Sequence, residues 1–385
     1  MAGAGIYIHI PFCIRKCLYC DFFSVPAAED TIAAYAGALC LEMERMSRVL
    51  PEREYDTVFL GGGTPSILMP EQIQIIMRTL RTHFSVRADA EISMECNPGT
   101  VTEAKLCGYR EAGINRLSVG LQSSDDVLLK TIGRIHTADM FFRTAAAVRK
   151  CGFDNFSVDI MHGLPGQTEA QYLETVRAAA GAGAKHISSY SLILEEGTPL
   201  YGMVSNGTVR LPDEEETADM EDAGAALLSR LGFVRYEISN YAKEGYRCRH
   251  NINYWRNGEY AGFGPGAHSA MHRQGWRRWN CPPDISAYLS SIQKGELPAY
   301  QSEQIGKEEE MFETVMMGLR LCEGVPFEDF RLRFSLDLRE IYADAIEKLK
   351  EAGWLDTDAY AAGRLALNTR GLDLQNRALS FFLEH

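Results

Sequence analysis

The 385-residue sequence has no excess of positive charge. Lys and Arg together number 39 against 52 Asp and Glu, so the formal net charge is −13. This balance argues against a broad electrostatic interaction with nucleic acid or anionic lipid, because both carry a dense negative charge of their own. We therefore expect no nucleic-acid partner.

Long hydrophobic segments are also missing. No stretch approaches the roughly 18 consecutive apolar residues of a membrane-spanning helix. The first thirteen residues lack the basic region that opens a signal peptide, and His9 and Pro11 interrupt their apolar run. We expect a soluble, cytoplasmic protein without a membrane span. The sequence leaves peripheral membrane contact and the oligomeric state open.

Low-complexity segments are absent too. A content of 46% apolar and 24% charged residues suffices for the cores of two or three domains. In a large chain without a secretion signal, the ten cysteines are expected to be thiols, metal ligands or core residues rather than a disulfide framework.

Short apolar runs alternate with helical patterns through residues 1–235, which is typical of repeated β-α units around a parallel sheet. Several runs are almost continuously apolar, as strands covered on both faces are. Six strands are predicted, at 5–11, 57–63, 91–97, 116–122, 155–164 and 186–194. Helices are predicted between them at 31–49, 70–83, 102–112, 137–150 and 168–182.

Six such units favour an α/β fold with a partial (β/α)6 barrel over residues 1–235, and a doubly wound sheet is the alternative. Residues 236–300 are aromatic and glycine-rich, and we expect an irregular bridging segment there. Residues 301–385 combine amphipathic helices with two strand-like pieces, GWL and RLALNT, which predicts a small α+β domain resembling a winged helix. No clear basic recognition face accompanies that domain.

Residues with reactive or polar side chains follow the predicted strands. In both architectures, ligands bind where the parallel strands end. Those ends carry Cys13, the 61–64 glycine turn, Glu95, Gln122 and Asp159. One shared site is the simplest expectation.

Cys13, Cys17 and Cys20 form a C-x3-C-x2-C motif directly after the first strand. Three thiolates at this spacing can converge on one inorganic centre, and a four-iron cluster held by only three of them keeps one iron open for another ligand. The alternatives are buried thiols or a structural zinc site completed by His9. Zinc would not account for the acidic, amide and glycine-rich groups at the other strand ends.

The segments YIHIPFCIRKCLYCDF, GGGTPS, ECNPG, SVGLQS and DIMHGLPGQ together resemble the radical S-adenosylmethionine (SAM) superfamily, and within it the branch of the oxygen-independent coproporphyrinogen III oxidases. The resemblance extends over nearly the whole chain. It implies a 4Fe-4S cluster on Cys13, Cys17 and Cys20 whose open iron binds SAM, so that an electron from the cluster can cleave SAM to a deoxyadenosyl radical. The protein supplies positioning and redox tuning in such chemistry.

The same resemblance implies a SAM site. Two tyrosines would flank the adenosyl group, and the glycine turn would bring its backbone close to the ligand because side chains are absent. Carboxylates and amides can accept from ribose hydroxyls or an ammonium, and an arginine can pair with a carboxylate. The implied cofactor-binding residues are Tyr7, Tyr19, Gly62, Gly63, Thr64, Glu95, Gln122, Arg134 and Asp159. Whether one or two SAM molecules bind stays open.

Two departures separate this sequence from the oxidases. Those enzymes have another cysteine two positions after the motif, where this chain has Phe22, and a longer N-terminal arm, where only twelve residues precede Cys13. By contrast, HNxxYW at 250–255 resembles the haem-binding motif of HemW-type haem chaperones. Imidazole is a good axial ligand of haem iron, and aromatic rings pack on a planar macrocycle. The resemblance implies haem binding by His250, Asn251, Tyr254 and Trp255. A helix-capping or core histidine is the alternative.

These resemblances predict a haem carrier that hands haem to acceptor proteins, with the cluster and SAM regulating or assisting the transfer. Its electrons would come from a flavodoxin-like or NADH-linked donor. The competing prediction is an enzyme, a radical SAM oxidase that decarboxylates the propionates of coproporphyrinogen III. A non-catalytic zinc-stabilised module is a third alternative. The sequence leaves open whether SAM is cleaved and whether haem attaches covalently.

Overall fold

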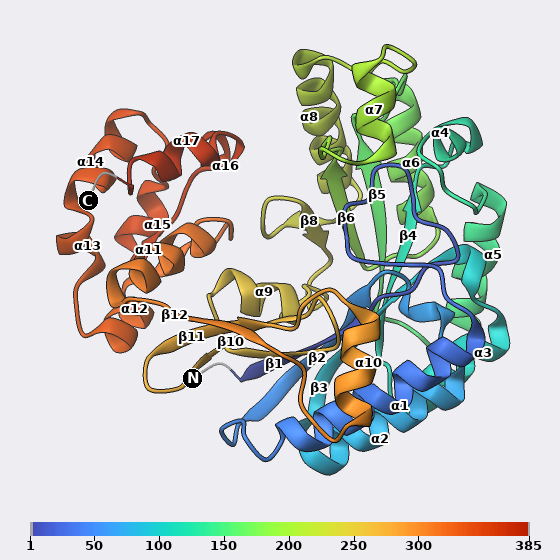
Figure 1. Ribbon diagram of the computed structural model, residues 1–385. Coiled ribbons are helices and arrows are strands. Elements are labelled where there is room, and N and C mark those ends of the chain that lie inside the picture. Colours follow the sequence, from blue (N-terminus) through green and yellow to red (C-terminus); the bar gives the residue numbers. More distant parts are fainter. Residues whose placement is uncertain (1–2, 384–385) are drawn as a thin grey trace.

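A computed structural model describes residues 3–383 of the chain. Six parallel strands at its centre pair with one another in chain order, which confirms the predicted partial barrel (Figure 1). The strands are β1 (Ala4–Ile10), β2 (Glu54–Gly62), β3 (Ser85–Cys96), β4 (Arg116–Gln122), β5 (Phe156–His162) and β6 (His186–Ser191). Each overlaps a predicted strand, and β2 and β3 begin earlier than predicted.

Helices follow each of these strands and cover one face of the sheet (Figure 1). They are α1 (Glu29–Met46), α2 (Pro70–His83), α3 (Glu103–Ala112), α4 (Asp126–Thr131), α5 (Ala138–Lys150), α6 (Glu169–Gly181), α7 (Pro199–Ser205) and α8 (Glu214–Arg230), with the 3-10 turns η1 (Pro65–Ile67) and η2 (Pro98–Thr100). Thr102, Thr137 and Thr168 precede α3, α5 and α6, and each side chain accepts a hydrogen bond from a backbone N–H of the first turn. Pro70 opens α2, where its missing N–H costs nothing.

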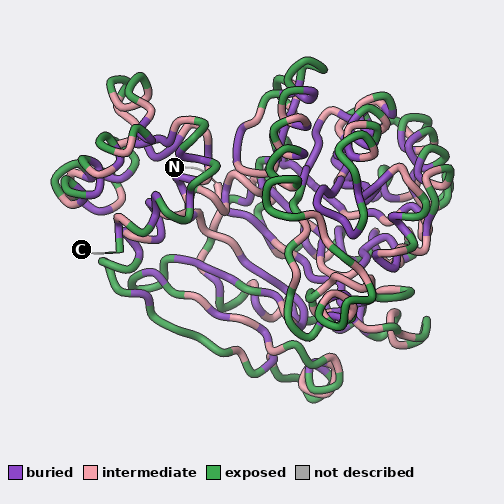
Figure 2. Tube along the Cα trace, turned by 90° about the horizontal axis from the view of Figure 1, so that it is seen from above, coloured by how far each residue is buried: buried purple, intermediate pink, exposed green. Residues whose placement is uncertain are grey.

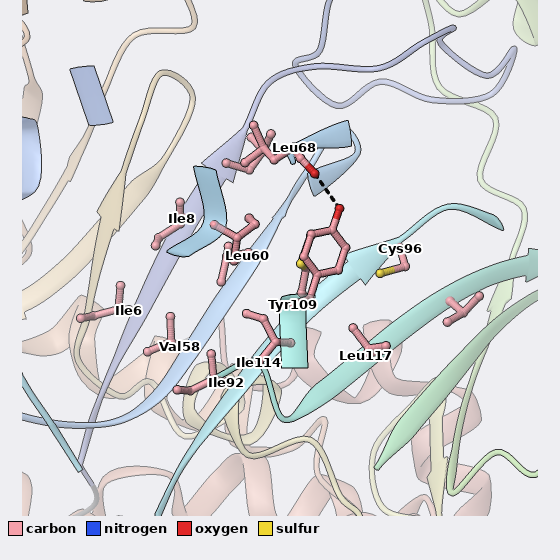
Figure 3. Close-up of a cluster of buried hydrophobic side chains, with 14 of the residues drawn as sticks. Ile6, Ile8, Val58, Leu60, Leu68, Ile92, Cys96, Tyr109, Ile114 and Leu117 are labelled. Atoms are coloured by element: carbon pink, nitrogen blue, oxygen red, sulfur yellow. Dashed lines mark hydrogen bonds between the residues drawn. The ribbon is translucent and has the colours of Figure 1, made fainter. Parts of the chain in front are cut away.

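The strand side chains alternate between two environments, as the period of a β-strand requires. One set, including Ile8, Leu60 and Leu117, packs against the helices in the main hydrophobic core (Figure 3). In that core the Tyr109 hydroxyl of α3 donates to the Leu68 carbonyl at 2.6 Å, so a buried polar group is paired (Figure 3). The other set faces the concave side of the sheet. Figure 2 shows that buried residues recur along the chain in the sheet region, with exposed residues on the outer helices.

Further strands extend the sheet at both edges to twelve. At one edge β9 (Tyr260–Phe263) pairs parallel with β1 and is followed by the antiparallel strands β10 (His268–His272), β11 (Trp276–Asn280) and β12 (Gln301–Gln304). At the other edge β8 (Asn240–Ala242) pairs antiparallel with β6 and with β7 (Val234–Arg235). The segment predicted to bridge the two regions, 236–300, therefore contains short strands that join the sheet. Strands of two to five residues interrupted by glycines are too short to show a two-residue period.

Two helices also belong to this region, α9 (Arg249–Trp255) and α10 (Ile285–Gln293). Helix α10 packs beside α1, whereas α9 lies against the starts of β1 and β2 (Figure 1). The HNxxYW motif thus occupies a helix rather than a loop.

The C-terminal region is helical and has a hydrophobic core of its own (Figure 1). Its elements are α11 (Lys307–Gly318), β13 (Val325–Pro326), α12 (Phe327–Phe334), α13 (Leu338–Ile341), α14 (Ala343–Glu351), α15 (Thr357–Ala361), β14 (Arg364–Leu365), α16 (Thr369–Asp373) and α17 (Gln375–Ser380). The two predicted strand-like pieces do pair, since the backbone N–H of Asp356 donates to Ala366 and that of Asn368 to Trp354, at 3.0 and 2.9 Å.

One disulfide departs from the expectation of free thiols. Cys107 on α3 is bonded to Cys151, which follows α5, while the other eight cysteines are free. The two residues are 44 positions apart, so nothing in their local sequence indicates that the neighbouring helices bring them together. Within residues 3–383, no helix is both long and apolar enough to cross a membrane.

Candidate functional site

A cavity of about 490 Å³ lies on the concave side of the parallel sheet. Its wall is built from alternate residues of the strands, so that β4 contributes Arg116, Ser118, Gly120 and Gln122 while the residues between them enter the core. The cysteine segment after β1 borders the cavity, and the start of α9 borders it as well. Nearly all the predicted site residues therefore share one cavity.

The three clustered cysteines lie on the segment that follows β1. Cys13, Cys17 and Cys20 are free, partly exposed, and all line the cavity. The Cys13 thiol lies 3.3 Å from the Thr64 hydroxyl. The Nη1 of Arg134 lies 3.7 Å from the Cys17 sulfur. The positive guanidinium would therefore stabilise the negative charge that this sulfur acquires on metal binding.

The donor set of the cysteine segment is that of an iron–sulfur cluster, although within residues 3–383 no three His, Cys, Asp or Glu side chains are already arranged to hold a metal ion. Three unbridged thiols open into one cavity, a cation accompanies one of them, and the cavity beyond supplies room for a ligand on an iron that lacks a fourth cysteine. The zinc alternative needed His9 as a ligand. Both nitrogens of the His9 ring are engaged, with the Tyr7 hydroxyl and the Phe23 carbonyl, each at 3.0 Å.

The glycine turn after β2 is required by close packing. Gly62 has φ +112°, and a Cβ there would lie 2.6 Å from the His9 ring. A Cβ on Gly63 would lie 2.6 Å from the Phe12 carbonyl oxygen. These glycines therefore allow β2 to pass the cysteine segment closely, and they leave their backbone bare toward the cavity. Thr64 is buried beside Cys13.

Two carboxyl groups face the cavity from β3 and β5. Glu95 accepts a hydrogen bond from the Gly62 N–H at 3.1 Å, and the Ser118 hydroxyl lies 3.0 Å from both oxygens of Asp159. Burial, and then the nearby Asp159, raises the pKa of Glu95 to about 8. Burial likewise raises the pKa of Asp159. A ligand cation in this cavity would favour the charged form of both groups.

The remaining predicted SAM residues surround these carboxyl groups. Gln122 ends β4 with φ 65°, a left-handed conformation that non-glycine residues seldom adopt. Tyr7 stacks on Phe59 with ring centroids 6.4 Å apart, and Tyr19 packs on a small apolar cluster that contains Met161. Tyr7, Tyr19, Gln122 and Arg134 all line the cavity.

The HNxxYW motif stands at the opposite end of the cavity from the cysteines. His250 is 1% exposed. Its Nδ1 lies 2.8 Å from the Thr57 hydroxyl, near the start of β2, and its Nε2 lies 3.0 Å from the Tyr254 hydroxyl. Burial, and then Arg116, lowers the pKa of His250 to about 3, so the ring is neutral. Neither ring nitrogen is free in this conformation.

The other three residues of the motif do not all face the cavity. Asn251 and Tyr254 line the cavity together with His250. Trp255 is not among the cavity-lining residues, and its ring lies instead beneath the Arg320 guanidinium, with 5.1 Å to the centroid. Trp255 therefore contacts the C-terminal region, which differs from its predicted role in the haem site.

Sequence reasoning missed several cavity residues. Arg116, Ser118, Ser188 and Tyr190 line it, and none was predicted. The alternation along β4 could have found the first two, because the predicted site residue Gln122 shares a strand face with Ser118 and Arg116. Ser188 and Tyr190 lie on β6, where no predicted site residue marked the inner face.

Family comparisons agree with this geometry. The model of the radical SAM superfamily matches residues 7–179, and that of the HemN C-terminal domain matches residues 305–374. The structure of coproporphyrinogen III oxidase (HemN) from Escherichia coli superimposes with a TM-score of 0.82 over 99% of this chain and 90% of that one. At 20% identity, that match establishes the fold alone. Together, the fold, the cysteine segment and the matched models define a protein of the radical SAM superfamily.

Relatives place the chain more narrowly. "Heme chaperone HemW" of Bacillus subtilis is 34% identical, with 98% of both chains covered. The protein of the same name from Escherichia coli is 42% identical over 69% of this chain and 70% of its own length, and that of Mycobacterium tuberculosis is 35% identical over 95% and 91%. The chain belongs to the HemW family.

Proposed function

We propose that this protein binds haem and transfers it to acceptor proteins, and that it carries a SAM-ligated 4Fe-4S cluster. The observation that carries the proposal is the single cavity, which is bordered by three free thiols at one end and by His250, Asn251 and Tyr254 at the other. Relatives named as haem chaperones over nearly the full chain length support the same reading.

Cys13, Cys17 and Cys20 would hold the cluster, which when bound would supply an electron to SAM. The chain's own residues would orient SAM. Glu95 and Asp159 offer acceptors to ribose hydroxyls or an ammonium, and Arg134 offers a cation to a carboxylate. The bare backbone of the glycine turn would allow close approach, and the aromatic rings of Tyr7 and Tyr19 would flank the adenosyl group.

Haem iron would be bound by His250 through Nε2. That nitrogen is hydrogen-bonded to the Tyr254 hydroxyl, so coordination requires the hydroxyl to move away. The Nδ1 contact with Thr57 can remain and would then hold the ring in place. The proposed haem contacts are therefore His250, Asn251 and Tyr254, without Trp255.

An electron donor of the flavodoxin-like or NADH-linked type completes the proposal. Ile14 and Phe22 on the cysteine segment are 56% and 64% exposed. Large apolar side chains beside the cluster cysteines provide a surface on which a redox partner can approach.

An anaerobic haem titration of the reconstituted protein, followed by Soret absorbance, tests the proposal. His250→Ala is expected to lose the band of the wild type, whereas Tyr254→Phe is expected to retain it, because it keeps the imidazole and removes the competing hydroxyl. His186→Ala is the matched control. That histidine is also buried with both nitrogens engaged, by Ser157 at 2.7 Å and Tyr236 at 2.9 Å, but it does not line the cavity.

Equal Soret bands in wild type and His250→Ala would contradict the role of His250. Turnover of coproporphyrinogen III in a complete anaerobic assay, without stable haem binding, would contradict the carrier function and support the oxidase.

A further inference from the structure

Arg116 is a buried cation without a partner. It opens β4, is 2% exposed, and lines the cavity. Its side chain forms no hydrogen bond or ion pair with the described residues, and its Nε is buried without an acceptor. A guanidinium carries five N–H donors, so leaving them unmatched in a buried position is costly.

The nearest carboxylates are occupied elsewhere. Glu91 accepts from the backbone N–H groups of Arg249 and His250, at 3.1 and 3.2 Å, and so caps the start of α9. Asp159 faces the Ser118 hydroxyl. Both carboxylates are close enough to act on Arg116 electrostatically, but neither forms an ion pair with it.

The cavity around Arg116 also offers a neutral donor. Asn251 lines it together with Arg116, whereas the hydroxyls of Ser118 and Ser188 are hydrogen-bonded to Asp159. A side-chain amide can add a hydrogen bond to an anion that the guanidinium holds. This group lies at the α9 end of the cavity, since Arg116 acts electrostatically on His250, whereas the other buried arginine, Arg134, lies at Cys17.

We propose that Arg116 is the anchor of a carboxylate-binding subsite at the α9 end of the cavity, and that it pairs with a carboxylate of the bound ligand. Two ligands could supply that group. One is a propionate of haem, which rests on the proposed function. The other is the carboxylate of a second SAM molecule, distinct from the one whose carboxylate faces Arg134, and this source does not depend on haem transport. In either case the ligand supplies the acceptors that the described residues do not.

The test titrates wild type and Arg116→Met, both with reconstituted cluster, with two pairs of probes. The first pair is haem and haem dimethyl ester, and the second is SAM and decarboxylated SAM. Loss of a charge-assisted pair should raise the Kd for the ligand that uses Arg116 by at least about tenfold. The partner probe, which lacks the carboxylate, should bind both proteins equally. The pair of probes for which only the carboxylate form loses affinity in Arg116→Met identifies the ligand whose carboxylate binds Arg116.

Equal binding of haem and of SAM by the two proteins would overturn the proposal. Failure of the wild type to bind haem would count against the proposed function instead, and the SAM pair would still decide the role of Arg116.

Discussion

The two ends of the cavity are built differently. At the cysteine end, three partly exposed thiols stand on a segment without regular structure, and few hydrogen bonds hold their side chains. At the α9 end, His250 is fully enclosed, both of its nitrogens are bonded, and Glu91 caps the helix that carries it. Residues at the first end are therefore available to an incoming cofactor, while those at the second also hold the fold together.

Cys17→Ser should have the largest effect on function. Without one of three thiolates the cluster should not assemble, so the brown colour of the anaerobically reconstituted protein should be lost. Because Cys17 is partly exposed and its sulfur accepts only a long hydrogen bond from Arg134, the unfolding temperature of the metal-free protein should stay unchanged. If the metal-free variant unfolds at a temperature far below that of the wild type, the cysteine end also holds the fold together, and the difference between the two ends is contradicted.

His250→Ala should show the opposite pattern in the metal-free protein. It leaves the Thr57 and Tyr254 hydroxyls without a partner and creates a cavity, which together should cost about 2–5 kcal/mol of unfolding free energy. Denaturant unfolding followed by circular dichroism measures this loss. Cluster absorbance after reconstitution should remain, since the cysteines are at the other end.

Gly62→Ala should affect both stability and SAM binding. Its φ of +112° disfavours any other residue, and the new Cβ would meet the His9 ring. A destabilisation of about 1–3 kcal/mol is expected. Gly197→Ala is a suitable control, because that glycine also has positive φ, at +82°, but nothing lies within 4 Å of the added Cβ. Only the Gly62 variant should weaken SAM binding in calorimetry.

Glu95 should make SAM binding depend on pH. Its pKa lies near 8 in the folded protein, above its usual 4.5, so the carboxyl group is protonated at neutral pH. Ionisation of the unfolded chain between pH 4.5 and 8 lowers the stability of the ligand-free fold over that range. A bound cation favours the carboxylate, so SAM affinity should rise from pH 6 to 8 by up to about tenfold per unit. Glu95→Gln should flatten the profile, and an unchanged profile would exclude Glu95 as its source.

Trp255→Phe should have the smallest effect. The ring packs under Arg320 and does not line the cavity, and a cation–π contact contributes about 0.5–1 kcal/mol at a partly exposed site. Haem affinity should therefore match that of the wild type. A large loss of Soret absorbance would show that haem contacts α9 from the side of the C-terminal region.

The features that could be predicted from the sequence are those whose residues lie close together along the chain. The spacing of Cys13, Cys17 and Cys20 and the alternation of strands and helices lie within short windows, and these predicted the site and the partial barrel. The Thr57 partner of His250 could not be found in this way, since it is 193 residues away. The unpaired state of Arg116 could not be predicted for a different reason. It is apparent only from the structure, in which Glu91 and Asp159 accept hydrogen bonds from other groups.

The most direct test is an anaerobic crystal structure of the reconstituted protein with haem. Haem is expected in the cavity, with its iron on His250 Nε2, the Tyr254 hydroxyl displaced, and the cluster on the three cysteines at the other end. Haem bound outside this cavity, with His250 still hydrogen-bonded to Thr57 and Tyr254, would contradict this expectation.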